Sequence, residues 1–129
     1  MNLTYGFSRT RNGLNENQKN QIIKLLEENN IKEVRHGDCI GADTYFHNLC
    51  QNKNINIIIH PPHVSIMRSF CQSPYILKPK PYLDRNKDIV DNCDILIACP
   101  ENDIEVMRSG TWSTIRYAKK MNKPVLLFV

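Results

Sequence analysis

Short apolar runs alternate with amphipathic helical stretches along this chain of 129 residues, and this alternation limits the possible folds more than any other feature. The runs Ile55–His60 and Asp94–Cys99 are almost continuously apolar, as expected for strands covered on both faces. Strands that alternate with helices form parallel βαβ units with right-handed crossovers. We therefore predict an α/β fold, a Rossmann-like three-layer sandwich with a mostly parallel sheet of about five strands.

The expected elements follow a β-α-β-α-β order, then an irregular stretch with a helix, then β-α-β. Strands are predicted at Leu3–Phe7, Glu33–His36, Ile55–His60, Asp94–Cys99 and Val125–Val129. Helices are predicted at Asn15–Asn29, Ala42–Asn52, Tyr82–Asn92 and Thr111–Met121, with Asn15 as an N-cap. The stretch from His63 to Lys80 is expected to be irregular.

Length and composition restrict the class of protein. The length fits one domain, so we expect residues 1–129 to form a single Rossmann-like domain. No stretch approaches the roughly 18 apolar residues of a membrane span, and the N-terminus lacks a signal-peptide pattern. We therefore expect a cytoplasmic protein without a membrane partner. The net charge of +4 suits an anionic ligand, but the basic residues are scattered, which disfavours nucleic acid.

The cysteines and histidines do not show the spacing of a disulfide framework or a metal site. The five cysteines are odd in number and contain no Cys-x-x-Cys pair, so reduced, buried thiols are expected. No metal and no cofactor are predicted. The four histidines are His36, His47, His60 and His63.

Four polar clusters come just after predicted strands or open the helices that follow. Parallel strands present their carboxyl ends at one edge of the sheet, where ligands bind in such folds. We therefore expect the four clusters to gather into a single pocket. They are Gly6-Phe7-Ser8-Arg9, Gly37 to Asp43, Arg85-Asn86 and Arg108 to Thr114.

The last cluster is the most informative, because a Ser-Gly-Thr tripeptide opens a helix. Gly110 permits close approach of a ligand, and free amides at a helix start favour an anion. Ser109, Thr111 and Thr114 add hydroxyl groups, and Arg108 can bind a phosphate. The alternative is an ordinary N-cap at Ser109 or Thr111. Trp112 is either a core anchor or a surface on which a base stacks.

The other clusters each have a structural alternative. Asp38 or Asp43 can bind a ribose hydroxyl or stabilise the start of a helix. Arg9 is a phosphate candidate or a solvated loop residue. Arg85 binds phosphate or pairs locally with Asp84 and Asp88. The carboxylate closest in sequence to the last cluster is that of Glu105, which can act as a base or pair with Arg108.

Taken together, these segments resemble the SLOG superfamily, most of all its YspA/YpsA-related branch, over nearly the whole chain. The resemblance implies a Rossmann-like fold and the binding of nucleotides, nucleotide-derived signals or, in the DNA-processing protein A relatives, single-stranded DNA. It also implies a homo-oligomer, a dimer or larger. The segments that carry it are Gly6 to Arg9, Gly37 to Asp43, Leu83 to Asn86, Asp94 to Pro100 and Ser109 to Trp112.

The chain is also similar to the Lonely Guy phosphoribohydrolases, which cleave the N-glycosidic bond of nucleoside monophosphates. Arg85-Asn86 matches their Arg-Lys pair, which implies a catalytic or phosphate-binding role for Arg85. Gly110-Thr111 matches the Gly-Thr of their Gly-Gly-x-Gly-Thr-x-x-Glu loop, but the position of the Glu is Thr114. The missing carboxylate favours binding over catalysis.

The leading hypothesis is therefore a module that binds a nucleotide-like small molecule, as a sensor or sponge. The alternatives are a nucleoside monophosphate N-glycosidase, with Arg85 and Glu105 as catalytic residues, and a single-stranded DNA binder. The predicted ligand-binding residues are Gly6, Ser8, Arg9, Gly37, Asp38, Gly41, Ala42, Asp43, Arg85, Asn86, Pro100, Arg108, Ser109, Gly110, Thr111, Trp112 and Thr114.

Overall fold

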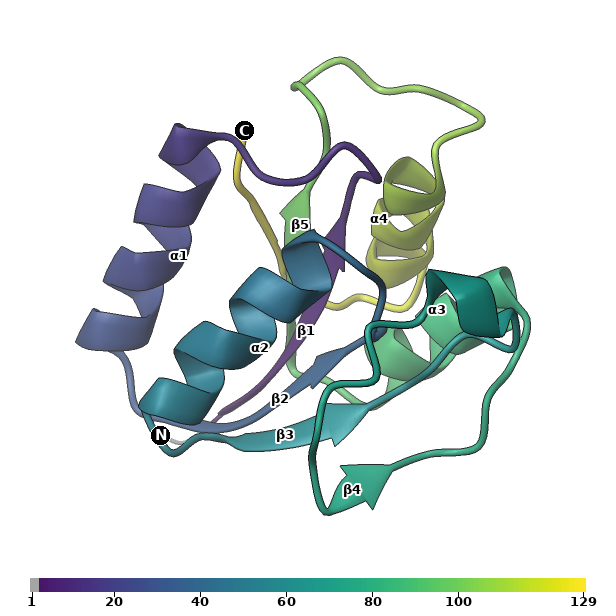
Figure 1. The fold of residues 1–129 in the computed structure, drawn as a ribbon. Helices are drawn as coiled ribbons and strands as arrows, with labels where there is room; N and C mark the ends of the chain where they lie inside the picture. The colour runs from purple at the N-terminus through teal and green to yellow at the C-terminus, as the bar shows by residue number, and fades with distance from the viewer. Residues whose placement is uncertain (1–2) are drawn as a thin grey trace.

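The computed structural model describes residues 3–129 as one parallel sheet covered by helices on both faces (Figure 1). The sheet has six strands in the order β4-β3-β2-β1-β5-β6, and every pairing is parallel. The strands are β1 (Leu3–Arg9), β2 (Ile31–His36), β3 (Asn56–Ile59), β4 (Tyr75–Ile76), β5 (Ile95–Cys99) and β6 (Val125–Leu127). The helices are α1 (Glu16–Glu28), α2 (Ala42–Asn52), α3 (Tyr82–Asp91) and α4 (Gly110–Lys120), with a 3-10 turn at Ser65–Met67. The predicted Rossmann-like α/β sandwich is confirmed.

The core lies in two layers, one on each face of the sheet. Strand β5 shows this directly, since successive side chains point to opposite faces. Ile97 and Cys99 belong to the layer under α1 and α2, whereas Leu96 and Ala98 belong to the layer under α3 and α4. A strand buried on both faces needs a continuous apolar sequence, which explains the runs read from the sequence.

Several boundaries differ from the prediction. Strand β4 was not predicted, and it lies inside the stretch expected to be irregular. Strand β1 continues through Ser8 and Arg9, which were expected in a loop, because these residues pair with Ala98 and Cys99 of β5. The Asn15 N-cap is confirmed, since its side chain and that of Gln18 form a capping box.

No helix in the described part of the chain combines the length and the apolar character that crossing a membrane requires.

Stacked aromatic rings join β1 to α2 in the first layer. The Phe7 and Phe46 ring centroids are 4.2 Å apart with nearly parallel planes, and both residues are buried. We expect Phe46→Ala to lower the free energy of unfolding by about 3–5 kcal/mol, because it removes the stack and leaves a cavity. Urea unfolding followed by circular dichroism measures this.

Phe70→Ala is the matched control, because Phe70 is 54% exposed. It should cost roughly 1 kcal/mol or less, since an exposed ring loses little apolar burial. Equal losses for the two variants would contradict the assignment of Phe46 to the core.

Candidate ligand-binding site

A cavity of about 590 Å³ opens at the carboxyl edge of the sheet. It lies between the loop after β1, the start of α3, and the loop from β5 into α4. We call it the outer cavity. Its lining residues are Arg9, Thr10, Arg11, Asn12, Tyr82, Leu83, Glu101, Asn102, Ile104, Val106, Arg108, Ser109, Gly110, Thr111 and Trp112. The volume is within the usual range for small-molecule sites.

One wall of the outer cavity is the N-terminus of α4. The Ser109 side chain caps the helix by accepting from the Trp112 amide, as the ordinary N-cap alternative expected. The amides of Gly110 and Thr111 belong to the first turn, where no helix carbonyl is available to them. A side chain at position 110 would force Tyr82 to move, since a Cβ there would lie 2.7 Å from atoms of the Tyr82 side chain. Gly110 thus lets Tyr82 pack against this turn.

The cationic groups of the outer cavity come from three arginines. Arg11 and Arg108 are exposed, and within residues 3–129 neither has an ion-pair partner. Arg9 is buried, and its Nε lies 3.4 Å from Asp43 Oδ1. Burial alone would lower the pKa of Arg9, but the Asp43 carboxylate raises it and the net shift is upward. Arg9 therefore keeps its charge.

Another part of the lining is apolar, and we call it the apolar wall. Trp112 belongs to the core under α3 and α4, as the core interpretation predicted, and it also lines the cavity, where stacking of a base on it stays a prediction. Leu83, Ile104 and Val106 line the cavity while remaining 53%, 70% and 51% exposed. The cavity thus combines guanidinium and amide donors with apolar surface that remains unburied.

A second, much smaller cavity of about 10 Å³ lies behind Arg9, and we call it the inner cavity. Arg9 lines both cavities. The other residues of the inner cavity are Phe7, Ser8, Gly37, Asp43, Arg85, Asn86 and Ile89.

Arg85 is 3% exposed and extends from α3 toward the ends of β2 and β3. Its Nη1 donates to the carbonyls of Gly37 at 2.5 Å and His60 at 3.0 Å, and its Nε donates to Asn86 Oδ1 at 2.9 Å. A Cβ on Gly37 would overlap the guanidinium, so glycine is required there. The predicted local pairing with Asp84 and Asp88 is wrong, because the side chain points inward and the Asp88 carboxylate binds Lys80.

The predicted site residues divide into three groups. Six line the outer cavity, namely Arg9, Arg108, Ser109, Gly110, Thr111 and Trp112. Five more line the inner cavity, namely Ser8, Gly37, Asp43, Arg85 and Asn86. The remainder line neither, namely Gly6, Asp38, Gly41, Ala42, Pro100, Glu105 and Thr114.

Two residues of the third group have other partners that explain their positions. Glu105 was expected near Arg108, but its carboxylate binds Arg116 Nη1 at 2.6 Å on the exposed loop. Asp38 is buried, accepts from the Cys71 amide and pairs with Arg68, so it fastens the segment before β4 to the β2–α2 loop.

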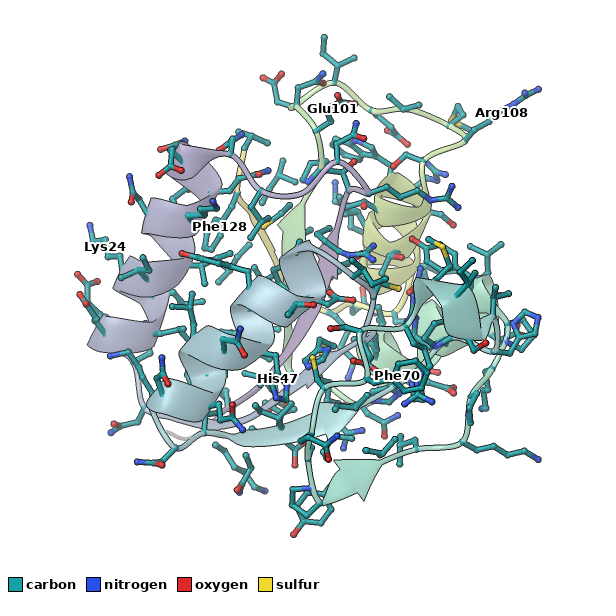
Figure 2. All side chains as sticks on the ribbon, in the orientation of Figure 1. Lys24, His47, Phe70, Glu101, Arg108 and Phe128 are labelled. Atoms are coloured by element: carbon teal, nitrogen blue, oxygen red, sulfur yellow. The ribbon has the colours of Figure 1, made fainter. Side chains whose placement is uncertain are left out.

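The sequence analysis missed several residues of the outer cavity, above all Tyr82 and Glu101. Glu101 directly follows Pro100 at the end of β5, a strand-end position of the kind used for the other clusters. Tyr82 opens α3 after Pro81, and no local pattern marks its contact with Gly110. Figure 2 shows Glu101 and Arg108 on the same loop, above the carboxyl ends of β1 and β5.

A cluster of titratable groups outside both cavities comprises His36, His47 and Cys71, whose candidate metal-binding atoms lie within 4.8 Å of one another. The Asp38 amide donates to His36 Nδ1, so the proton of the neutral ring is on Nε2. His36 Nε2 lies 2.9 Å from His47 Nδ1 and therefore donates to it. A metal ion would have to displace this proton and the Asp38 amide. The hydrogen bonds thus fit a structural role for the cluster.

The sequence matches no protein-family model and no curated protein. Its structure is similar to a molybdenum cofactor binding protein from the phototrophic bacterium Rippkaea orientalis, with 20% identity and a TM-score of 0.74 over 98% of this chain and 76% of that one. It is also similar to DNA processing protein A (DprA) from Streptococcus pneumoniae, with 16% identity and a TM-score of 0.71 over 98% of this chain and 50% of that one. A third similar structure is TM1055, with 17% identity and a TM-score of 0.62 over 97% of this chain and 72% of that one.

At these identities the likeness shows the fold alone. The chain spans half of the DNA processing protein A chain. That protein is among the relatives named by the SLOG resemblance, and its likeness to this chain is one of fold.

The buried histidines predict a loss of stability in acid. Burial lowers the pKa of His36 and of His60 to about 4, from an ordinary value of 6.5. The unfolded chain binds protons below pH 6.5 and the folded chain does so only near pH 4, so stability is complete above 6.5 and falls between these values. Between pH 6.5 and 4, each histidine should lower the free energy of unfolding by up to about 1.4 kcal/mol per pH unit.

Urea unfolding at pH 7.5, 6.0 and 5.0 tests this. His60→Gln should make the fall with pH shallower, whereas His63→Gln, at an exposed position, should leave it unchanged. A free energy of unfolding that stays constant from pH 7.5 to 5.0 would contradict the prediction.

Proposed function

We propose that this protein binds a nucleotide or nucleotide-derived small molecule in the outer cavity. The observation that carries the proposal is the pairing, in one cavity, of a helix N-terminus flanked by free arginines with an exposed apolar wall. A ligand that fills such a site has an anionic end and an apolar or planar end. Nucleotides have this chemistry.

The phosphate end fits the start of α4. The first-turn amides of Gly110 and Thr111 and the helix dipole favour an anion there. Arg108 adjoins this turn, and an arginine can donate two hydrogen bonds to one phosphate. Arg11 adds a second cationic group that is not committed to an ion pair within residues 3–129.

The base end fits the apolar wall. Tyr82 and Trp112 supply aromatic surface, and Leu83, Ile104 and Val106 supply aliphatic surface that is largely exposed. Covering it with a planar base would remove apolar area from water, worth about 25 cal/mol per Å². Two structural neighbours are a cofactor binding protein and a DNA processing protein, which is compatible with a small-molecule or nucleic-acid ligand here.

Calorimetric titration with AMP, GMP, CMP and UMP tests the proposal. At least one should bind, and Arg108→Gln should weaken that binding about tenfold or more, because a charge-assisted phosphate contact is lost. Lys24→Gln is the matched control, since it also removes one exposed positive charge, but on α1 far from the cavity (Figure 2).

Two results would reject the proposal. One is the absence of binding by all four nucleotides at millimolar concentration. The other is an equal effect of Arg108→Gln and Lys24→Gln, which would show only general electrostatic attraction. Salt-dependent binding of an oligonucleotide in place of the mononucleotides would favour the single-stranded DNA alternative.

One observation favours a second function, cleavage of the N-glycosidic bond of a bound nucleoside monophosphate. Among the described residues that line the outer cavity, the carboxylate belongs to Glu101, whose Oε1 accepts from Asn12 Nδ2 at 3.2 Å. A carboxylate beside the sugar can position water or stabilise positive charge that develops on the ring. Glu101 thus takes the place that the sequence analysis gave to Glu105.

This second function predicts release of free base from a nucleoside monophosphate, measured by chromatography. Glu101→Gln should lower the rate about 100-fold or more, because a general acid or base contributes at least that factor. Glu105→Gln should retain the rate, since its carboxylate is held outside the cavity by Arg116. Binding without release of base, in the unaltered protein, would leave the binding function alone.

A further inference from the structure

Two buried polar atoms, Asp43 Oδ1 and Asn86 Nδ2, have no hydrogen-bond partner among the described residues, and both belong to residues that line the inner cavity. Asp43 is 2% exposed and Asn86 is 7% exposed, and both side chains line the cavity. Buried polar atoms left unpaired are unfavourable, because they lose their hydrogen bonds to water without gaining others. One of them is an acceptor and the other is a donor, so a group that both donates and accepts has the chemistry that they lack.

The chemical identity of each atom follows from its neighbours. The arginine guanidinium only donates, so the Asn86 atom that lies 2.9 Å from Arg85 Nε must be the amide oxygen. The amide nitrogen is therefore the unpaired atom. Asp43 Oδ2 accepts from the Cys39 amide at 2.9 Å, which leaves Oδ1. Arg9 Nε forms an ion pair with Asp43 Oδ1 at 3.4 Å, but this contact is not a hydrogen bond.

These groups select the chemistry of the occupant. A phosphate or carboxylate would meet the unpaired oxygen of Asp43 and be repelled. An ammonium group would meet the Asn86 amide protons and the guanidinium groups of Arg9 and Arg85. A hydroxyl group both donates and accepts, so its chemistry suits an unpaired acceptor such as Asp43 Oδ1 and an unpaired donor such as Asn86 Nδ2. The volume of about 10 Å³ is that of one water-sized group.

A hydroxyl group can come from water or from a bound ligand. Arg9 lines both the inner and the outer cavity, so the inner cavity adjoins the site proposed for the nucleotide. We infer that the inner cavity receives a ribose hydroxyl of the ligand, and that the protein therefore selects ribonucleotides over deoxynucleotides. This inference rests on the proposed nucleotide-binding function and adds a recognition site to it.

The test compares AMP, GMP, CMP and UMP with their 2′,3′-dideoxy counterparts by calorimetry. For any nucleotide that binds, removal of the ribose hydroxyls should weaken binding about 10- to 100-fold, because a hydrogen bond to a buried carboxylate is lost. In Asp43→Asn, an amide nitrogen replaces the unpaired carboxylate oxygen. The ratio of the dideoxynucleotide Kd to the ribonucleotide Kd should then fall to about twofold or less.

Two variants serve as controls. Asp91→Asn makes the same chemical change on α3, where the carboxylate accepts from the Tyr117 hydroxyl outside both cavities, and it should retain the full ratio. Arg108→Gln should weaken ribonucleotides and dideoxynucleotides equally and also retain the ratio. If Asp43→Asn does not fold, as judged by circular dichroism, Asn86→Leu replaces it and should also remove the ratio.

The outcomes separate the two proposals. Equal affinity for ribonucleotides and dideoxynucleotides would overturn the ribose site while leaving nucleotide binding intact, and the cavity would then hold water only. A ratio that survives both Asp43→Asn and Asn86→Leu would also overturn it. Failure of every nucleotide to bind would overturn both the ribose site and the nucleotide-binding function.

Discussion

The guanidinium of Arg85 is the group on which the carboxyl edge of the sheet depends. It is buried, and among residues 3–129 no carboxylate lies within ion-pair distance. Its charge is instead satisfied by the carbonyls of Gly37 and His60, by Asn86 Oδ1, and by the Tyr82 ring 5.0 Å away. Because arginine does not lose its proton in proteins, these dipoles must hold a permanent charge.

This arrangement has three consequences for the site. It joins α3 to the ends of β2 and β3, two strands that are not adjacent to it in sequence. It requires glycine at position 37, where a Cβ would overlap the guanidinium. It also fixes the orientation of the Asn86 amide, so that the nitrogen is left unpaired at the inner cavity. Arg85 therefore determines which Asn86 atom is unpaired at the inner cavity, although the hydrogen bonds of Arg85 itself are made to the protein.

The sequence was sufficient for the parts of the fold that depend on local pattern. Strand β5 and helix α1 were predicted because continuous apolar runs and an N-cap are local signals. Strand β4 was missed because it has only two residues, both exposed, between prolines at 74 and 79. The extension of β1 through Arg9 was missed because a polar residue is buried there only through its pairing with Cys99 and Asp43.

The candidate site, like the fold, could be predicted from the sequence only where it depends on local pattern. The turn at Gly110 is recognisable because a helix start has a known chemistry, whereas the role of Arg85 depends on carbonyls 48 and 25 residues away in sequence. Once placed, the cationic groups divide by what balances them. Arg9 is balanced by Asp43 and Arg85 by carbonyl dipoles, while Arg11 and Arg108 are exposed and uncommitted within residues 3–129. In the proposed site, attraction of an anion therefore depends on the exposed pair and is weakened by salt, whereas the proposed selection at the inner cavity depends on buried hydrogen bonds that salt screens far less.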